Sequence, residues 1–593
     1  MSSKYLITTA KKNTWKFDRP VLFLGKWATL YSKRKYWKDI DHVVLPYHWD
    51  DRNKLLKDYK YSIRLMNDLI PVISQTLNKV HQLDKNEKYW RMIIGPWLGQ
   101  FIQVMLDRWS SIKQAFSQYE INGTTILKSN SKEIVAGNME DFRSMIEGDT
   151  WNHYIYSEII KFRGLLSQKQ INYKYDSSNS KKNNITNFSN NSIIHRLFSK
   201  VNYHLTKRNK FFFVDYAVNG KRQIILELLL GQLTNIQPTP LLPISTKSEL
   251  KEMRNNFLVN YIVQNEFESF LIFMIPKCIP YVYLSGFEQL RCSVNKSQCW
   301  PLKPKVIICS TAHNSNDFFK VWVAENIIKN NNKLIIAQHG GNYGLAKFNF
   351  FEDLELSIAD YYFSWGWKKV GFKNIFPMPS LKIDRYRRRL KPTKKGGILI
   401  ITGNLPRYSY FLNSLPIGPQ VEEYFLDMFS LVSNFNSTVF KNTVVRLYPY
   451  KDYEWDQKNR WLNTFPGIKF DDNSKTMHES VSNSRVAVGT YNSTTILELM
   501  GAKMPIVLFW NPNHSEIRKS AVPFFKDLLD AKILHKDPKN AADFINCNWE
   551  NISDWWNSKK VQVAIKNFCE LYAKTSEKAL YDWKQTLEYV ANK

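Results

Sequence analysis

The chain of 593 residues is long enough for two or more domains with large cores, and its apolar fraction of 44% is that of a globular protein. No apolar run approaches the roughly 18–20 residues of a membrane-spanning helix, and residues 1–10 lack the apolar core of a signal peptide. The six cysteines include no CxxC pair, so we expect reduced thiols and a cytoplasmic protein.

The formal net charge of +30 calls for an anionic partner. Nucleic acid, an anionic membrane surface and acidic small substrates all have the required sign. The basic residues form separate clusters at 33–38, 200–210, 382–395 and 559–560, and no helix-turn-helix, zinc-finger or RNA-recognition signature occurs. We therefore expect no nucleic acid as partner, and peripheral association with an anionic membrane at the inner face of the plasma membrane.

The N-terminal part predicts short strands separated by polar turns. YLITTA (5–10), VLFLG (21–25) and the start of VVLPYHWDDR (43–52) are strand-like, and 54–116 is mainly helical with an interruption at Gly95-Pro96. Asp50 and Asp51 follow the third strand, at the end where open α/β sheets bind ligands, and we assign them to substrate binding. Residues 176–192, rich in Asn and Ser, are predicted to form a flexible loop.

A strand–helix–strand unit in the middle of the chain carries a candidate catalytic histidine. VIICSTA (306–312) predicts a strand, 316–330 a helix, and KLIIAQHGGNYG (333–344) a strand ending in a glycine-rich turn. His339 suits proton transfer near neutral pH, although a lone histidine at a strand end is more often structural. The paired glycines allow close approach of a substrate. Substrate binding is assigned to the other residues of this turn, Gln338, Gly340, Gly341 and Tyr343.

Carboxylates near this turn are candidates for a base or a nucleophile. Glu352, Asp353 and Glu355 follow it in the sequence, and Glu325 adjoins the buried stripe of the preceding helix. One of them would deprotonate an acceptor hydroxyl or attack an anomeric carbon, and the sequence leaves both routes open.

Alternating strands and helices from residue 396 onward predict a second parallel sheet. Strands are expected within 396–404, 443–449, 467–472 and 486–489 and after Met504-Pro505. The predicted architecture is α/β, with two Rossmann-like lobes facing across a cleft and extra N-terminal helices. We assign 1–390 to an acceptor-side lobe, 391–550 to a donor-binding lobe, and 551–593 to helices that pack back on the first lobe.

The stretch VAVGTYNSTTILELMGAKMPIVLFW (486–510) predicts a phosphate site. Its hydroxyl-rich turn stands where a helix begins, and free N–H groups with the positive end of the helix dipole suit a phosphate there, although an ordinary helix cap fits as well. Glu498, one turn further, is placed to hold ribose hydroxyls. Arg446 and Tyr448 end a strand nearby, and a guanidinium beside hydroxyl donors binds a diphosphate without a metal. The remaining residues assigned to the nucleotide are Tyr491, Ser493, Thr494 and Thr495.

The motifs PYHWDDR, YWR..IGPWLG.F, QHGG.YG, AD.YF.WGW and the closing T.LE…..P…FW occur together along most of the chain. As a set they resemble a transferase family of lipopolysaccharide O-antigen gene clusters, which is similar to GT-B glycosyltransferases, including those that use CMP-activated ulosonic or nonulosonic acids. The resemblance implies a GT-B-like fold that transfers a sugar from a nucleotide-sugar donor to a lipid-linked glycan acceptor, with no further cofactor. It places Gln338 to Gly341 and Tyr343 at the cleft, and Thr494, Thr495 and Glu498 at the nucleotide.

Two other functions stay open at this point. A teichoic-acid-type transferase of glycerophosphate from a CDP-alditol would use the same two lobes and a cytidine nucleotide. A basic nucleic-acid-binding protein would show affinity for generic DNA or RNA that falls steeply with salt.

Overall fold

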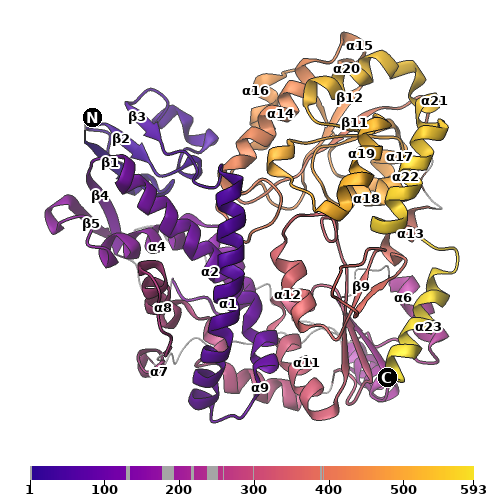
Figure 1. Ribbon diagram of the computed structural model, residues 1–593, viewed down its shortest axis with the longest axis horizontal. Helices are drawn as coiled ribbons and strands as arrows, with labels where there is room; N and C mark the ends of the chain where they lie inside the picture. The colour runs from indigo at the N-terminus through magenta and orange to yellow at the C-terminus, as the bar shows by residue number, and fades with distance from the viewer. Residues whose placement is uncertain are drawn as a thin grey trace.

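A computed structural model describes residues 3–128, 134–175, 193–215, 220–236, 251–257, 259–297, 299–387, 390 and 393–593. Three parallel sheets carry the fold (Figure 1), and the strand pairs recorded within these ranges are all parallel. The predicted α/β class with parallel sheets and N-terminal helices is confirmed. The predicted loop at 176–192 lies outside the described residues.

The N-terminal part contains two of the three sheets, each with five strands. The first has the order β3-β2-β1-β4-β5 and the second β10-β9-β8-β7-β6. The first sheet consists of β1 (Lys4–Ile7), β2 (Val21–Phe23), β3 (His42–Val44), β4 (Ile121–Lys128) and β5 (Ile171–Tyr175). The second consists of β6 (Phe211–Val214), β7 (Val306–Cys309), β8 (Lys333–Ala337), β9 (Tyr361–Ser364) and β10 (Ile375–Pro377).

The third sheet has six strands in the order β13-β12-β11-β14-β15-β16. Successive strands are added on one side of β11 and then, from β14 onward, on the other side. The crevice between the loops that follow β11 and β14 is therefore a topological switch point, where open parallel sheets bind ligands. The strands are β11 (Gly397–Ile401), β12 (Thr443–Arg446), β13 (Lys469–Phe470), β14 (Ser484–Gly489), β15 (Ile506–Phe509) and β16 (Leu534–His535).

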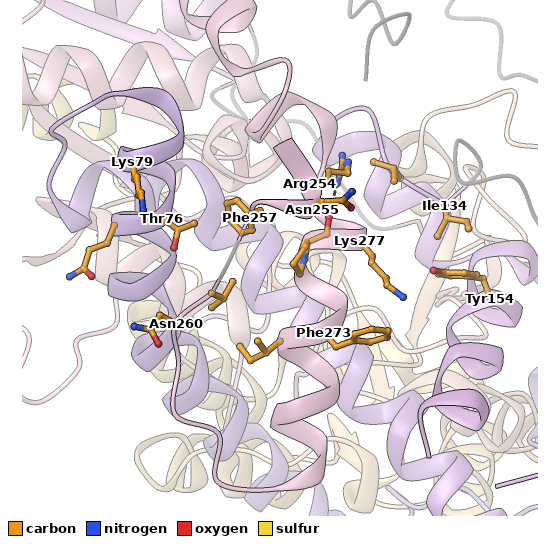
Figure 2. A pocket seen from close by; sticks show the side chains of 15 residues that line it. Thr76, Lys79, Ile134, Tyr154, Arg254, Asn255, Phe257, Asn260, Phe273 and Lys277 are labelled. Atoms are coloured by element: carbon orange, nitrogen blue, oxygen red, sulfur yellow. Dashed lines mark hydrogen bonds between the residues drawn. The ribbon is translucent and has the colours of Figure 1, made fainter. Parts of the chain in front are cut away.

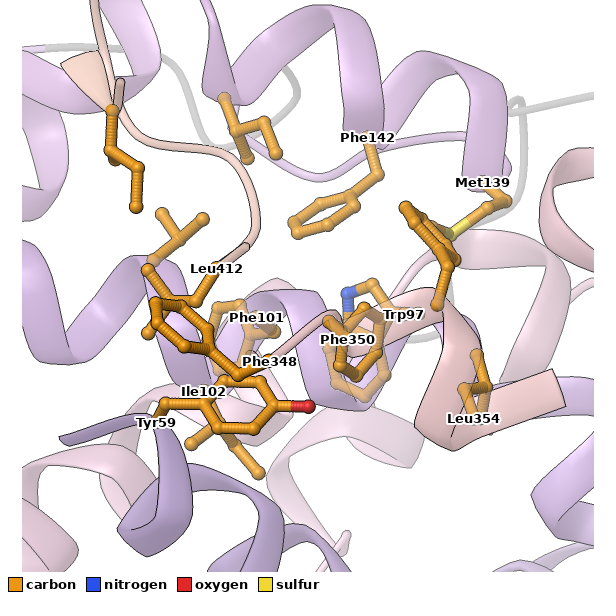
Figure 3. Close-up of a cluster of buried hydrophobic side chains, with 14 of the residues drawn as sticks. Tyr59, Trp97, Phe101, Ile102, Met139, Phe142, Phe348, Phe350, Leu354 and Leu412 are labelled. Atoms are coloured by element: carbon orange, nitrogen blue, oxygen red, sulfur yellow. The ribbon is translucent and has the colours of Figure 1, made fainter. Parts of the chain in front are cut away.

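Two long helices, α1 (Arg52–His81) and α2 (Glu87–Gln118), pack against each other in the middle of the molecule (Figure 1). The expected interruption at Gly95-Pro96 is wrong, because α2 runs through both residues without a break. A side chain at Gly99 would lie 2.3 Å from the Phe350 ring, so this glycine lets α12 (Phe350–Ile358) approach α2 closely. Burial on all sides, seen around Trp97 and Phe101 in Figure 3, holds the helix together despite Pro96.

The helices bear on whether any segment of the chain could span a membrane. In the part of the chain that the structure describes, no helix combines the length and the apolar character needed to span a bilayer. Near the C-terminus, α22 (Lys559–Tyr572) packs on α18 (Thr494–Gly501), and α23 (Ala579–Ala591) crosses to the second sheet, where it contacts β7.

Buried arginine–carboxylate pairs join the third sheet to the rest of the molecule. Arg407 binds both oxygens of Asp149 at 2.9 Å, and Arg52 binds both oxygens of Glu516 at 2.8 Å. Burial raises the pKa of the Asp149 carboxyl, but the Arg407 guanidinium outweighs it and holds that pKa below the usual range. Bidentate pairs fix both distance and orientation, so these contacts set how the third sheet faces the other two.

Candidate functional site

A cavity of about 1090 Å³ lies at the carboxyl edge of the third sheet. It is lined by the ends of β11 and β12, the segment 473–483 and the start of α18, and it therefore occupies the switch point of this sheet. Its size suits a nucleotide with an attached sugar. The structure brings six of the predicted nucleotide-binding residues together here, namely Arg446, Tyr448, Tyr491, Thr494, Thr495 and Glu498.

The start of α18 forms one wall of this cavity. Ser493 is the N-cap residue, but its side chain makes no capping hydrogen bond, and it does not line the cavity itself. The Thr494 hydroxyl accepts a hydrogen bond of 2.8 Å from the Gly341 N–H instead of capping its own helix. The helix start therefore has no side-chain cap, and its first two residues, Thr494 and Thr495, line the cavity. An uncapped helix start is suited to an anion.

Glu498 lies in the wall of the cavity between a lysine and a histidine side chain. Lys382 approaches one carboxylate oxygen at 3.1 Å and His478 the other at 3.6 Å. Burial raises the pKa of Glu498, but its hydrogen bond to His478 and the charge of Lys382 hold the pKa below the usual value. The carboxylate is thus ionised at neutral pH and can accept hydrogen bonds from sugar hydroxyls.

Arg446 is held in place by the protein itself. It forms an ion pair of 2.8 Å with Asp471 and donates to the Ser480 hydroxyl and the Lys475 carbonyl, both at 3.0 Å. These contacts orient a guanidinium whose residue, like Tyr448 beside it, lines the cavity. Because the charge is half neutralised by Asp471, Arg446 contributes direction more than net charge.

The glycine-rich turn after β8 meets the start of α18 across the cleft. Gln338, assigned above to substrate binding, is bonded within the protein: its NH₂ donates to the Gly340 carbonyl at 2.8 Å, and its oxygen accepts from Trp365 N–H and Trp367 Nε1. A Cβ on Gly341 would lie 2.4 Å from the Ser493 carbonyl carbon. Gly341, assigned above to substrate approach, thus permits contact between two parts of the protein.

His339 is the side chain of this turn that remains available. Its Nδ1 is buried and has no hydrogen-bond partner within the described residues. Burial lowers the pKa of the imidazole, and the charges of Lys382 and Arg143 lower it further, whereas Glu355 acts in the opposite direction. A neutral ring with a free nitrogen is the state that a general base needs.

The carboxylate beside His339 is Glu355, which is fully buried. Its Oε1 accepts a hydrogen bond of 2.9 Å from the Tyr343 hydroxyl and lies 3.2 Å from His313 Nε2. Tyr343, assigned to substrate binding, is therefore buried and bonded to this carboxylate, which corrects that assignment. The network fixes the ring position next to Tyr343, whose aromatic ring lies 5.2 Å from that of His339.

Three of the four carboxylates named as base or nucleophile, Glu352, Asp353 and Glu325, have partners within the fold. Glu352 is bound by Arg518 at 2.8 Å through both oxygens and by the Gly344 N–H, and Asp353 accepts from the Tyr59 hydroxyl and pairs with Lys369. Glu325 is bound by Lys85, between α1 and α2, by Tyr89 on α2 and by Arg291 on α9 (Phe287–Lys296). Within the described residues no contact of these three carboxylates with His339 is recorded, so the structure gives them structural partners rather than a place beside the histidine.

Asp50 and Asp51 also have structural partners. The Asp51 carboxylate caps α1 by accepting from Asn53 N–H at 2.9 Å and Lys54 N–H at 3.1 Å. Asp50 accepts a hydrogen bond of 3.0 Å from the Gln420 amide. Their place after β3 was predicted, but local capping explains Asp51 better than substrate binding does.

Sequence reasoning missed the basic side chains that surround His339 and Glu498. Lys382 and His478 come from segments about 20 to 120 residues from Glu498, and Arg143 comes from α3 (Met139–Ile146) of the N-terminal part. No local sequence pattern indicates these residues, and the cluster of basic residues at 382–395 is the one signal that includes any of them. Among the residues described, no three His, Cys, Asp or Glu side chains are grouped as ligands of a metal ion.

A second cavity, of about 1050 Å³, lies between α1 and α8 (Glu266–Cys278), away from the predicted site residues (Figure 2). Its lining is mainly apolar, with Lys79, Arg254 and Lys277 as the charged members, and the lining side chains include no carboxylate or histidine. It therefore lacks a group to move a proton at neutral pH, and the third-sheet cavity remains the candidate catalytic site.

The fold and the site define an α/β protein with a cavity at the switch point of a parallel sheet, and the turn that carries His339 contacts the wall of this cavity. The chain belongs to the LIC12162 family transferases, because the model of that family matches residues 4–587. It is therefore a transferase, and the resemblance to a transferase family is confirmed. No protein of curated function matches the sequence.

Several solved structures are similar to parts of the chain. An α,α-trehalose 6-phosphate synthase from Burkholderia multivorans has 12% identity and a TM-score of 0.30, over 48% of this chain and 70% of that one. WaaG, a glycosyltransferase involved in lipopolysaccharide biosynthesis, has 10% identity and a TM-score of 0.28, over 64% and 99%. The UDP-GlcNAc 2-epimerase from Neisseria meningitidis has 10% identity and a TM-score of 0.29, over 61% and 98%. Similarity at this level carries no further conclusion.

Proposed function

We propose that the protein is a glycosyltransferase that takes a nucleotide-sugar donor into the third-sheet cavity and passes the sugar to an acceptor hydroxyl at His339. The observation that carries the proposal is the hydrogen bond between Gly341 N–H and Thr494 Oγ1, because it places the uncapped helix start and the histidine turn against each other. An anion site and a proton acceptor then lie on either side of one reacting centre.

The proposed reaction needs a displacement at the anomeric carbon. His339 accepts the acceptor's hydroxyl proton as the new C–O bond forms, and the bond between the anomeric carbon and the phosphate oxygen breaks. The negative charge on the departing nucleotide develops at the start of α18, where N–H groups and the helix dipole stabilise it. The proposal requires no metal or other cofactor, and the acceptor is proposed to be a lipid-linked glycan of a surface polysaccharide.

Arg143 supports an acidic donor sugar. It lies in the last turn of α3, and no ion pair or hydrogen bond of its guanidinium is recorded within the described residues. Burial mainly sets the pKa values of His339, Tyr410 and Tyr453, and the Arg143 charge acts on all three. A guanidinium without a carboxylate partner, surrounded by parts of two sheets, suits the carboxylate of a CMP-activated ulosonic or nonulosonic acid.

Replacement of Arg143 by Gln is expected to raise KM for an acidic nucleotide sugar by about 10- to 100-fold, because a charge-assisted hydrogen bond is lost. The affinity for CMP alone should remain, and Arg143→Lys should recover part of the loss. Steady-state kinetics with acidic and neutral donors measure the effect. Arg64→Gln, an equal loss of charge at an exposed position of α1, is the control. Equal loss with both donors would assign Arg143 a structural role.

The direct test of the proposed donor site is Glu498→Gln with CMP as ligand. Calorimetry should show weaker binding by about 10-fold or more, because hydrogen bonds from the ribose to a charged acceptor disappear. Wild type should bind CMP better than its 2′,3′-dideoxy analogue, and the variant should lose this preference. Glu570→Gln on α22 is the matched control. Unchanged preference in Glu498→Gln would refute the ribose assignment, and a CDP-alcohol assayed in parallel distinguishes alditol-phosphate transfer from sugar transfer.

A further inference from the structure

Helix α6 (Gly220–Leu229) turns its apolar side toward solvent, which is the reverse of the usual pattern. Ile224, Ile225, Leu228 and Leu229 follow the i, i+1, i+4, i+5 spacing of one helix face, and each is 44–56% exposed. The buried side holds Glu227, which accepts a hydrogen bond of 2.8 Å from Gln223, beside Leu226. Because this arrangement buries a carboxyl group and exposes aliphatic side chains, we expect the exposed side of α6 to contact a partner.

The apolar surface continues beyond the helix. The segment after α6 is tied to α5 (Ile193–Thr206) by hydrogen bonds from Asn202 Nδ2 to the Thr234 carbonyl at 3.0 Å and from Ile236 N–H to Asn202 Oδ1 at 3.2 Å. These two neighbouring segments add further aliphatic side chains that are 47–60% exposed, namely Val201, Leu205, Leu233 and Ile236. We call this set, together with the four on α6, the α6 face.

The chain segments that form the α6 face are mainly basic, although one of their basic side chains, Arg222, is paired with Asp384. Residues 199–236 contain six basic side chains, Lys200, Lys207, Arg208, Lys210, Lys221 and Arg222, against the two acidic ones Asp215 and Glu227. Burial raises the pKa of Glu227 to about 7, so this carboxyl is only partly ionised at neutral pH. The local excess of positive charge agrees in sign with the net charge of +30 for the chain.

We propose that the α6 face docks on an anionic membrane surface, with the aliphatic side chains in the headgroup boundary and the flanking lysines and arginines on lipid phosphates. Branched aliphatic residues flanked by Lys and Arg are typical of interfacial membrane anchors. Protein interfaces are instead depleted in Lys, whereas the segments that form the α6 face contain four lysines, Lys200, Lys207, Lys210 and Lys221.

The α6 face also lies next to the candidate active site. Arg222 forms an ion pair with Asp384 and donates to the Leu381 carbonyl at 3.1 Å, both on α13 (Leu381–Arg387). The same helix carries Lys382, which reaches Glu498 in the cavity wall. If the proposed function holds, a membrane on the α6 face delivers a lipid-linked acceptor to the cavity. Membrane docking itself does not depend on that function.

The test is flotation of the full-length protein with vesicles of phosphatidylcholine alone or with added phosphatidylglycerol. The wild-type protein should float with the anionic vesicles, and the floating fraction should fall as the salt concentration is raised. The triple variant Ile225→Gln, Leu228→Gln, Leu229→Gln should bind about tenfold or more weakly. The control triple Leu426→Gln, Val563→Gln, Ile328→Gln removes equally exposed aliphatics elsewhere and should bind like wild type.

Circular dichroism and thermal melting establish that each triple variant is folded, and CMP calorimetry on the α6 triple keeps this question apart from the donor site. Wild type that ignores anionic vesicles, or an α6 triple that binds them as well as wild type, overturns the proposal. Sedimentation showing a wild-type dimer that the α6 triple abolishes would assign the α6 face to a second copy of the chain and would likewise overturn it.

Discussion

Replacement of His339 by Ala is expected to lower kcat by about 10²–10⁴-fold, the usual contribution of a positioned general base. CMP affinity should be kept, because the ring belongs to the turn after β8 and does not line the nucleotide cavity. Single-turnover measurement of sugar transfer, beside CMP calorimetry on the same preparation, separates the two quantities. Full activity in His339→Ala would show that another group takes the proton.

The pH dependence of wild type provides a second measurement of the same assignment. Burial disfavours the charged imidazolium, so the pKa of His339 lies below its ordinary value of 6.5. The base is then active at neutral pH, and kcat/KM should fall only as the pH drops below 6.5 toward the lowered pKa. Glu355→Gln removes the negative charge that raises this pKa, so its acidic limb should move to still lower pH. Disappearance of that limb in His339→Gln is the control, and an unchanged limb would contradict the assignment.

The donor part of the site was predictable because it is local in sequence. The strand, the hydroxyl-rich turn and the helix together occupy only 16 consecutive residues, 486–501. Hydrophobic periodicity and helix-start signals identify such a unit without knowledge of its neighbours. Arg446 and Tyr448 were placed beside it on the condition that their strands are neighbours. In the structure β11 lies between β12 and β14, but both strands end at the same edge of the sheet.

The catalytic part was less predictable because its carboxylates are decided by distant partners. Glu352 and Glu355 are three residues apart on one helix, and nothing in their local sequence separates them. Arg518, 166 residues away, neutralises the first, whereas His313 and Tyr343 surround the second. Glu325 was likewise decided by Lys85, 240 residues away. Only tertiary contacts distinguish a structural carboxylate from one beside a reactive group.

The sequence identified Gly340-Gly341 as a place of close approach, but it did not identify the group that approaches. Two glycines after a strand indicate that something approaches the backbone closely, and the sequence suggested a substrate. The approaching group is the backbone of residues 493–494. Gly341 therefore controls the relative position of the two halves of the site, and its replacement should affect function more strongly than that of Gly340.

Gly341→Ala is expected to lower both the apparent Tm and the transfer rate. The new methyl carbon would lie 2.4 Å from the Ser493 carbonyl carbon and 2.6 Å from Thr494 N, and these backbone atoms cannot rotate away. Overpacking of this kind costs about 1–3 kcal/mol. Relief requires the turn and the helix start to separate, which breaks the bond from Gly341 N–H to Thr494 Oγ1 and moves His339 from the donor. A misplacement of about 1 Å lowers turnover by roughly 100-fold.

Three further variants distinguish the backbone clash in Gly341→Ala from loss of the hydrogen bond and from a general effect of a glycine replacement. Gly340→Ala places its methyl carbon 3.0 Å from the Thr494 hydroxyl, a side-chain atom that can move, and should lose much less activity. Thr494→Val removes the hydrogen bond without adding bulk between the backbones. Gly467→Ala, where the nearest atom is 3.8 Å away, should behave like wild type. If Gly341→Ala keeps wild-type turnover, the close contact is not needed for transfer, and the two halves of the proposed site act independently of their spacing.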